Sequence, residues 1–104
     1  MSGKAHWHLL CYDIADEKRL RRFHRFMKDQ GLPLQYSVFL LRRSSLELIQ
    51  LMERIRQHID EKTDDVRIYP ISANMEFIAL GRQALGPGMT LTAKGLIELT
   101  RRAD

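Results

Sequence analysis

The chain has little cysteine and little proline: Cys11 is its single cysteine, and three prolines are spread over 104 residues. One cysteine cannot form a disulfide within the chain, and it excludes a zinc site built from several cysteines of one chain. There is no run of about 18 or more apolar residues, so the sequence predicts no membrane-spanning helix. The first residues also lack the long apolar stretch of a signal peptide. We therefore expect a cytoplasmic protein without a membrane partner.

The remaining composition is that of a globular domain, with 44% hydrophobic and 29% charged residues. A chain of this length forms one domain with a core of its own. Residues 81–88 (GRQALGPG) hold three glycines and a proline, which indicates a hinge or loop. We therefore expect a core domain at residues 1–80. Residues 81–104 would then form a hinge and a C-terminal segment, which is apolar enough to dock on the core or on a partner subunit.

Hydrophobic spacing and turn signals predict the secondary structure. The expected order is strand, helix, strand, helix, strand, strand, at residues 6–14, 15–30, 34–41, 44–60, 66–72 and 75–80. Asp16 suits the N-cap of the first helix, and Ser44 with Glu47 forms a capping box for the second. The alternation of the middle strand is imperfect near Ser37, so a bend or bulge is expected there. The sum is an α+β fold in which two helices cover one face of a sheet.

Each helix has an apolar stripe that should face the core. In the first helix the stripe is Leu20, Phe23 and Met27. In the second helix the stripe is Leu48, Met52, Ile55 and Ile59. Tyr36 and Phe39 are expected in the core as well, and stacking on nucleic-acid bases is the alternative for these two rings.

Charge is unevenly distributed along the chain, whose formal net charge is +4. The first helix and the end of the middle strand carry the cations Lys18, Arg19, Arg21, Arg22, Arg25, Lys28, Arg42 and Arg43. The acids gather elsewhere, at Asp60, Glu61, Asp64 and Asp65. Clustered cations without interleaved acids predict a face that binds the phosphates of a nucleic acid. The alternative is an ordinary solvated helix face.

Asp13 ends the first strand, directly before the basic helix. Mg²⁺ usually takes one or two protein carboxylates and completes its shell with water and phosphate oxygens. Asp13 is therefore a candidate metal ligand for chemistry on phosphates. A two-fold axis near Asp13 would supply a second carboxylate from another copy of the chain. The alternative is a turn residue that accepts hydrogen bonds from backbone N–H groups.

Four features together resemble the Cas-two family of small CRISPR-associated proteins: YDI at 12–14, the basic helix that follows it, QYSVF at 35–39 and VRIYPI at 66–71. The resemblance covers residues 6–80. It implies a ferredoxin-like sandwich with an antiparallel sheet, and a homodimer whose C-terminal strand packs on the partner's sheet. The ferredoxin-like plan has two middle strands where residues 34–41 show one run.

The same resemblance implies a function in the adaptive immunity of prokaryotes. Family members sit between two dimers of the Cas-one integrase, in a complex that captures short double-stranded DNA for insertion as new spacers. Some are described as metal-dependent endonucleases on single-stranded RNA or double-stranded DNA, which implies Mg²⁺ or Mn²⁺ as the cofactor. Asp13 matches the metal-site carboxylate, and Tyr12, Arg22 and Phe39 match its neighbours in the catalytic site.

Three functional hypotheses follow. The first is a homodimeric adaptor that holds duplex DNA for the integrase. The second is an endonuclease that cuts phosphodiesters at Asp13, and one dimer can have both functions. The third is a non-catalytic ferredoxin-like interaction module.

Overall fold

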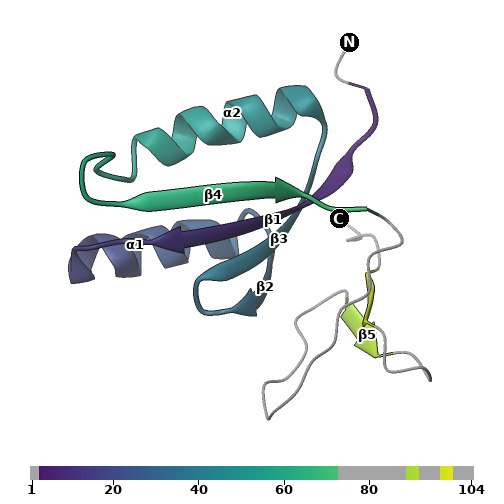
Figure 1. Cartoon of the computed structure of the whole chain (residues 1–104), viewed down its shortest axis with the longest axis horizontal. Coiled ribbons are helices and arrows are strands. Elements are labelled where there is room, and N and C mark those ends of the chain that lie inside the picture. The colour runs from purple at the N-terminus through teal and green to yellow at the C-terminus, as the bar shows by residue number, and fades with distance from the viewer. Residues whose placement is uncertain (1–2, 73–88, 92–96, 100–104) are drawn as a thin grey trace.

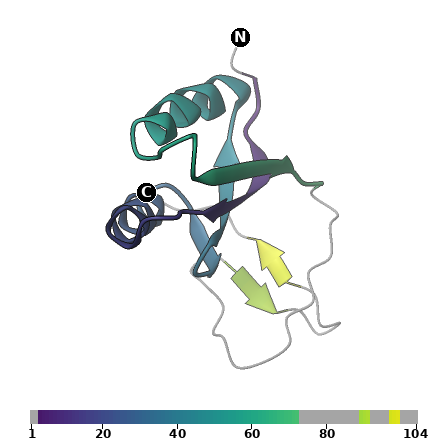
Figure 2. The ribbon, with the colours of Figure 1, turned by 60° about the vertical axis from the view of Figure 1, so that its left-hand side comes forward.

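The computed structural model describes residues 3–72, 89–91 and 97–99 of the chain. Its elements are β1 (His6–Asp13), α1 (Glu17–Lys28), β2 (Leu32–Gln35), β3 (Val38–Arg43), α2 (Ser45–Arg56), β4 (Asp65–Pro70), β5 (Met89–Leu91) and β6 (Ile97–Leu99). The first four strands form one antiparallel sheet in the order β2-β3-β1-β4, and both helices lie on the same side of it (Figures 1 and 2). This arrangement confirms the predicted α+β fold. No helix among these residues is long and apolar enough to cross a membrane.

The middle strand predicted at residues 34–41 is in fact a hairpin of β2 and β3. Tyr36 and Ser37 form the turn between them, and the strand register shifts between Pro33 and Gln35. The sequence concealed this reversal because no glycine or asparagine marks the turn. Pro33 is tolerated because β2 is an edge strand, where a missing backbone donor breaks no second ladder. The bend expected near Ser37 is therefore a full turn.

Both helices begin at the predicted caps. Asp16 accepts a hydrogen bond from the backbone N–H of Arg19, and Ser44 and Glu47 form the complete capping box. Gly31 follows α1 at a point of close approach, since a Cβ atom there would overlap the Leu40 carbonyl oxygen. Glycine is thus required where the chain leaves the helix to enter the sheet.

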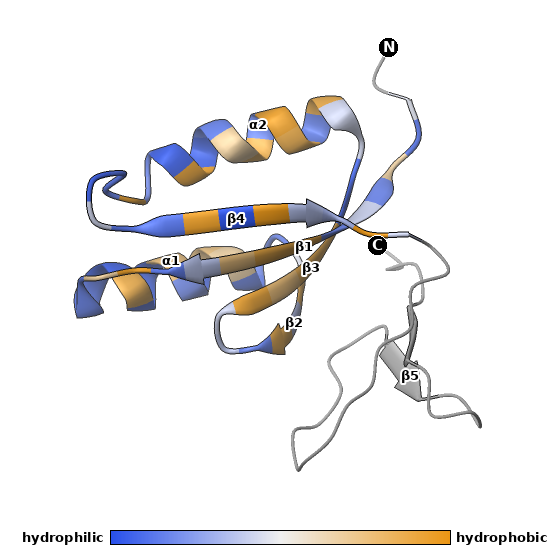
Figure 3. Ribbon diagram, viewed as in Figure 1, coloured by the Kyte–Doolittle hydropathy of each residue, from blue (hydrophilic) through white to orange (hydrophobic). Residues whose placement is uncertain are grey.

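The main core lies between the helices and the sheet. Its fully buried members include Leu10, Phe23, Met27, Phe39 and Leu41. Strand alternation supplies the sheet side of this core, and β4 shows the alternation of polar and apolar residues along its length (Figure 3).

The α2 stripe was predicted partly wrongly. Leu51 and Ile55 are buried, whereas Met52 is 38% exposed. Leu48 and Ile59 are half-buried beside them. The contact stripe steps from Leu48 to Leu51 and then to Ile55, because α2 meets the sheet along a line rotated by about one residue from the predicted one.

Most of the C-terminal segment lies outside the described residues. The strand predicted at 75–80 and the hinge at 81–88 lie outside the described residues. Residues 89–91 and 97–99 pair as the antiparallel strands β5 and β6.

Candidate nucleic-acid interface

Asp13 lies at the end of β1 and is exposed. Its neighbours Leu10 and Tyr12 point into the core beneath the helices. Because side chains alternate along a strand, Asp13 points to the opposite, helix-free face of the sheet. This position leaves its carboxylate open to a ligand.

Asp65 is the residue directly opposite Asp13 in the pairing of β1 with β4. Directly opposed residues of an antiparallel pair have Cβ atoms about 5 Å apart, and like charges in such a pair repel each other. Asp65 is also exposed, and it forms an ion pair of 2.8 Å with Arg67. The sequence pattern groups Asp65 only with the acids at 60–65 and does not place it near Asp13. The signal that would have placed it beside Asp13 is the antiparallel pairing of the first and last core strands.

Tyr12 and Phe39 lie under this site and not at its surface. Phe39 has no exposed area, and Tyr12 is 6% exposed. Burial raises the pKa of the Tyr12 phenol, so its hydroxyl stays protonated at neutral pH. Neither ring contacts solvent enough to touch a substrate, and both support the strand end that carries Asp13.

Arg19 differs from the other cations of α1 because it is engaged within the fold. Its Nε donates to Asp64 Oδ2 at 2.6 Å and its Nη2 donates to Asp64 Oδ1 at 2.9 Å. The backbone N–H groups of Ala15 and Asp60 donate to the same carboxylate. The Arg19 guanidinium and these N–H groups hold the pKa of Asp64 well below its usual range. Arg19 is therefore not one of the open cations, although the sequence predicted it among them.

The other predicted cations of α1 are exposed on the side of the helix away from the core. They are Lys18, Arg21, Arg22, Arg25 and Lys28. Phe23 and Met27 on the opposite side of the helix are buried. A spacing of three or four residues brings these cations together along one face of α1. The helix begins at Glu17, four residues after Asp13, so the row of cations follows the strand end that carries the open carboxylate.

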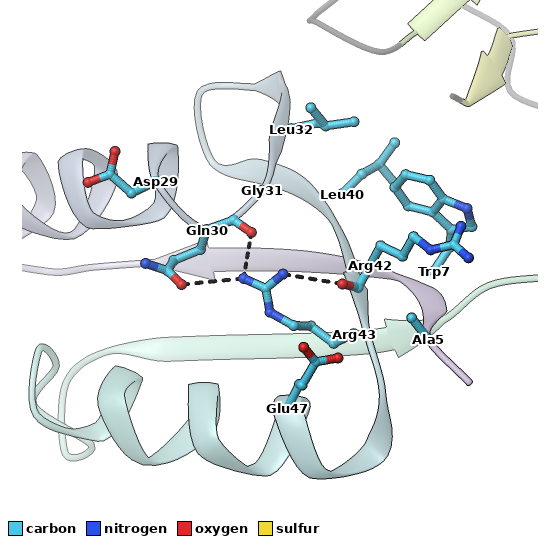
Figure 4. A pocket seen from close by; sticks show the side chains of 10 residues that line it. All are labelled: Ala5, Trp7, Asp29, Gln30, Gly31, Leu32, Leu40, Arg42, Arg43 and Glu47. Atoms are coloured by element: carbon cyan, nitrogen blue, oxygen red, sulfur yellow. Dashed lines mark hydrogen bonds between the residues drawn. The ribbon is translucent and has the colours of Figure 1, made fainter. Parts of the chain in front are cut away.

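Arg42 and Arg43 lie at the other end of the sheet. Arg42 pairs with Trp7 and Arg43 with His6 at the start of β1, about 20 Å from Asp13 along the strand. They line a hollow of about 460 Å³ where α1 ends (Figure 4). Arg43 donates to the carbonyl oxygens of Gln30 and Arg42 and to the Gln30 side chain, so it fastens the end of α1 to β3. Arg42 is exposed over the Trp7 ring, with its guanidinium carbon 5.8 Å from the ring centroid.

The carboxylates around Asp13 fit a magnesium or manganese site that water and phosphate complete. They do not fit a site in which protein side chains supply every ligand. Within the described ranges no three histidine, cysteine, aspartate or glutamate side chains converge to hold a metal. Mg²⁺ needs only one or two carboxylates when phosphate and water complete its shell, and Asp13 with Asp65 offers that set. A site of this kind binds its ion together with the phosphate.

Comparison with known proteins identifies the family. A family model described as "CRISPR associated protein Cas2" matches residues 6–77. The chain belongs to the Cas2 family. It is 46% identical over 74 residues to "CRISPR-associated endoribonuclease Cas2 2" of Thermodesulfovibrio yellowstonii, covering 71% of this chain and 81% of the relative. It is 40% identical to "CRISPR-associated endoribonuclease Cas2 1" of Nitrosomonas europaea, covering 78% of this chain and 77% of the relative. The resemblance predicted from residues 12–14, 35–39 and 66–71 is thereby confirmed.

Solved structures agree with this assignment to the Cas2 family. A hypothetical protein, TT1823, from Thermus thermophilus matches with a TM-score of 0.70 and 29% identity, over 79% of this chain and 98% of that one. Streptococcus pyogenes Cas2, crystallised at pH 6.5, matches with a TM-score of 0.59 and 36% identity, over 65% of this chain and 88% of that one. The ferredoxin-like arrangement of the core is thus shared with both solved structures.

Proposed function

We propose that this protein binds nucleic acid along the exposed cations of α1 and cuts phosphodiester bonds at Asp13 in the presence of Mg²⁺ or Mn²⁺. The observation that carries this proposal is the exposed Asp13 carboxylate at the end of β1, the strand that leads directly into the helix with the open cations. The names of the relatives, which describe endoribonucleases, support a nuclease reaction on RNA.

Each residue has a distinct part in this proposal. Asp13 would hold the metal ion, with Asp65 or the Asp13 of a second copy as the other carboxylate. When bound, the ion polarises the phosphodiester and lowers the pKa of water. Arg22 and its neighbours on α1 neutralise phosphate charge and set the position of the backbone. Tyr12 and Phe39 position the strand end from below.

The test is cleavage of single-stranded RNA and of duplex DNA with Mg²⁺ or Mn²⁺. We expect Asp13→Asn to abolish cutting, by at least about 100-fold, while binding persists. Asp29→Asn is the matched control, because Asp29 is also an exposed carboxylate but lies at the far end of α1. Equal cutting by wild type and Asp13→Asn would refute the role of Asp13.

We also propose that a homodimer of this chain holds double-stranded DNA for the Cas-one integrase during CRISPR adaptation. The favouring observation is that the open cations extend along the whole of α1 and do not converge on Asp13 alone. Such a row suits the spaced phosphates of a duplex, and it carries no sequence information.

The adaptor function predicts DNA capture that survives Asp13→Asn and weakens steeply as salt rises. Titration of labelled duplex DNA at several salt concentrations measures this, and co-elution with the integrase on a sizing column tests the complex. Negligible DNA affinity even at low salt would support the third hypothesis, a non-catalytic interaction module.

A further inference from the structure

Tyr36 is an exposed aromatic ring on the turn between β2 and β3. Tyr36 is 52% exposed, although its place in an apolar run predicts a core position. The turn lies at the Asp13 end of the sheet, because the carbonyl of Ser37 accepts a hydrogen bond of 3.1 Å from the Tyr12 backbone N–H. An exposed ring at this end of the sheet requires an explanation that core packing does not supply.

The inner face of the Tyr36 ring is stacked on His24 of α1. The ring centroids are 4.2 Å apart and the planes differ by 11°. The His24 ring is itself fixed, because its Nδ1 lies 2.7 Å from the Tyr12 hydroxyl oxygen. The single Tyr12 hydroxyl proton is donated to the Tyr36 carbonyl oxygen at 2.6 Å, so His24 Nδ1 must carry a proton and donate to Tyr12. A buried anchor thus holds both rings in a rigid stack.

Open cations border this stack. His24 is on α1, one turn after Arg21 and one turn before Lys28, and both of these cations are exposed. The Lys28 charge adds to burial in lowering the pKa of His24, which indicates that the two side chains lie close together. A rigid aromatic face next to a row of cations is the combination with which proteins bind single-stranded nucleic acids.

We propose that the outer face of Tyr36 stacks an unpaired base of a single-stranded nucleic acid, while Arg21 and Lys28 contact its phosphates. This inference rests on the proposed function, and it adds that the site prefers single strands to duplexes. A duplex keeps its bases stacked on each other, so it can use the cations but not the ring. The ring therefore adds affinity for single strands only.

The chain offers well-matched variants. Tyr36→Leu removes the aromatic face and keeps the anchor, because Tyr12 bonds to the backbone carbonyl of Tyr36 and not to its ring. Tyr36→Trp keeps a stacking face. Tyr69→Leu is the control, since Tyr69 is 46% exposed but lies on β4, away from α1.

The experiment compares binding of a labelled single-stranded RNA, the same strand with abasic sites, and a duplex of equal charge. It uses the catalytically silent Asp13→Asn background, so that the RNA stays intact. We expect Tyr36→Leu to weaken binding of the intact single strand by about tenfold. Duplex and abasic affinities should stay unchanged, and Tyr36→Trp and Tyr69→Leu should bind as the parent does.

Three results would overturn the inference in distinguishable ways. If the parent binds single strands with strong salt dependence and Tyr36→Leu binds them equally well, the stacking platform is wrong while the proposed function stands. If the parent binds neither single strands nor duplexes at low salt, both the proposed function and base stacking on Tyr36 are refuted. Equal losses for single strand, abasic strand and duplex would assign Tyr36 a structural role and refute base stacking.

Discussion

The two flanks of helix α1 use similar residues in different ways. The flank facing α2 and β4 pairs Arg19 with Asp64 and stacks Phe26 on His58, with ring centroids 4.2 Å apart. The flank facing the β2–β3 turn stacks His24 on Tyr36 at the same ring separation. On the first flank the ion pair and the stack join α1 to neighbouring elements, and the Asp64 side chain has no exposed area. On the second flank the outer ring is exposed and the neighbouring cations are open.

This difference separates charges that stabilise the fold from charges that are available to a ligand. Arg19 and Arg21 are two residues apart on one helix, yet only Arg19 is held by a carboxylate in the described part of the chain. The carboxylates differ in the same way, since Asp64 is enclosed by donors and Asp13 is exposed. Residue type alone therefore does not identify the interface, and the topology decides which charges stay open.

The largest effect on stability is expected from Asp64→Ala. The Asp64 carboxylate joins the β1–α1 junction, α1 and the turn before β4 through Ala15, Arg19 and Asp60. Because the pair lies near the surface and is screened by solvent, we expect a loss of about 2 kcal/mol in the free energy of unfolding, less than for a fully buried pair. Urea denaturation measures this. Asp65→Ala, one residue along the chain and exposed, should cost much less. Equal losses would contradict the distinction between enclosed and exposed carboxylates.

Much of the fold could be predicted from the sequence because its signals are local. The caps at Asp16 and Ser44 depend on residues three positions away, and the core stripe of α1 depends on helical spacing. The hairpin could not be found in this way, because Tyr36 and Ser37 give no strong turn signal between two apolar strands.

The site was predictable only in part, for a physical reason. Asp13 was identified from its place at a strand end. The partners that decide which charges are open are distant in sequence: Asp64 is 45 residues from Arg19, and Asp65 meets Asp13 only through strand pairing. The exposure of Tyr36 likewise follows from the hairpin, which brings the turn back over α1. Such contacts depend on topology and not on local pattern.

A smaller effect distinguishes Arg19 from Arg21 in binding. Arg21→Gln should lower the slope of log affinity against log salt by about one, because one phosphate contact is lost. Arg19→Gln should leave the slope unchanged and lower thermal stability, because Asp64 loses its cation. Duplex DNA titrations at several salt concentrations, together with thermal unfolding of each variant, measure both quantities. A reduced slope for Arg19→Gln with unchanged stability would show that the ion pair opens to bind phosphate.

The smallest effect is a difference in the pH dependence of stability between the two flanks. Burial lowers the pKa of His24 below its ordinary 6.5, so the unfolded chain binds the proton more readily than the folded one. Stability should therefore fall as pH drops below about 6.5, and His8, whose pKa burial also lowers, adds to this loss. Asp64, whose pKa is lowered from 3.8, contributes stability that is lost only as pH falls below about that value.

Urea denaturation at pH values from about 7.5 down to about 3 separates these two windows. His24→Phe keeps a ring stacked on Tyr36 and removes the titrating group, so its stability should fall less than that of the wild type near pH 6. Asp64→Ala should keep the loss near pH 6 and show a weaker loss at acidic pH. If the free energy of unfolding changes with pH equally in His24→Phe and wild type near pH 6, then the fold does not lower the pKa of His24. That result would contradict a neutral His24 ring fixed between Tyr12 and Tyr36.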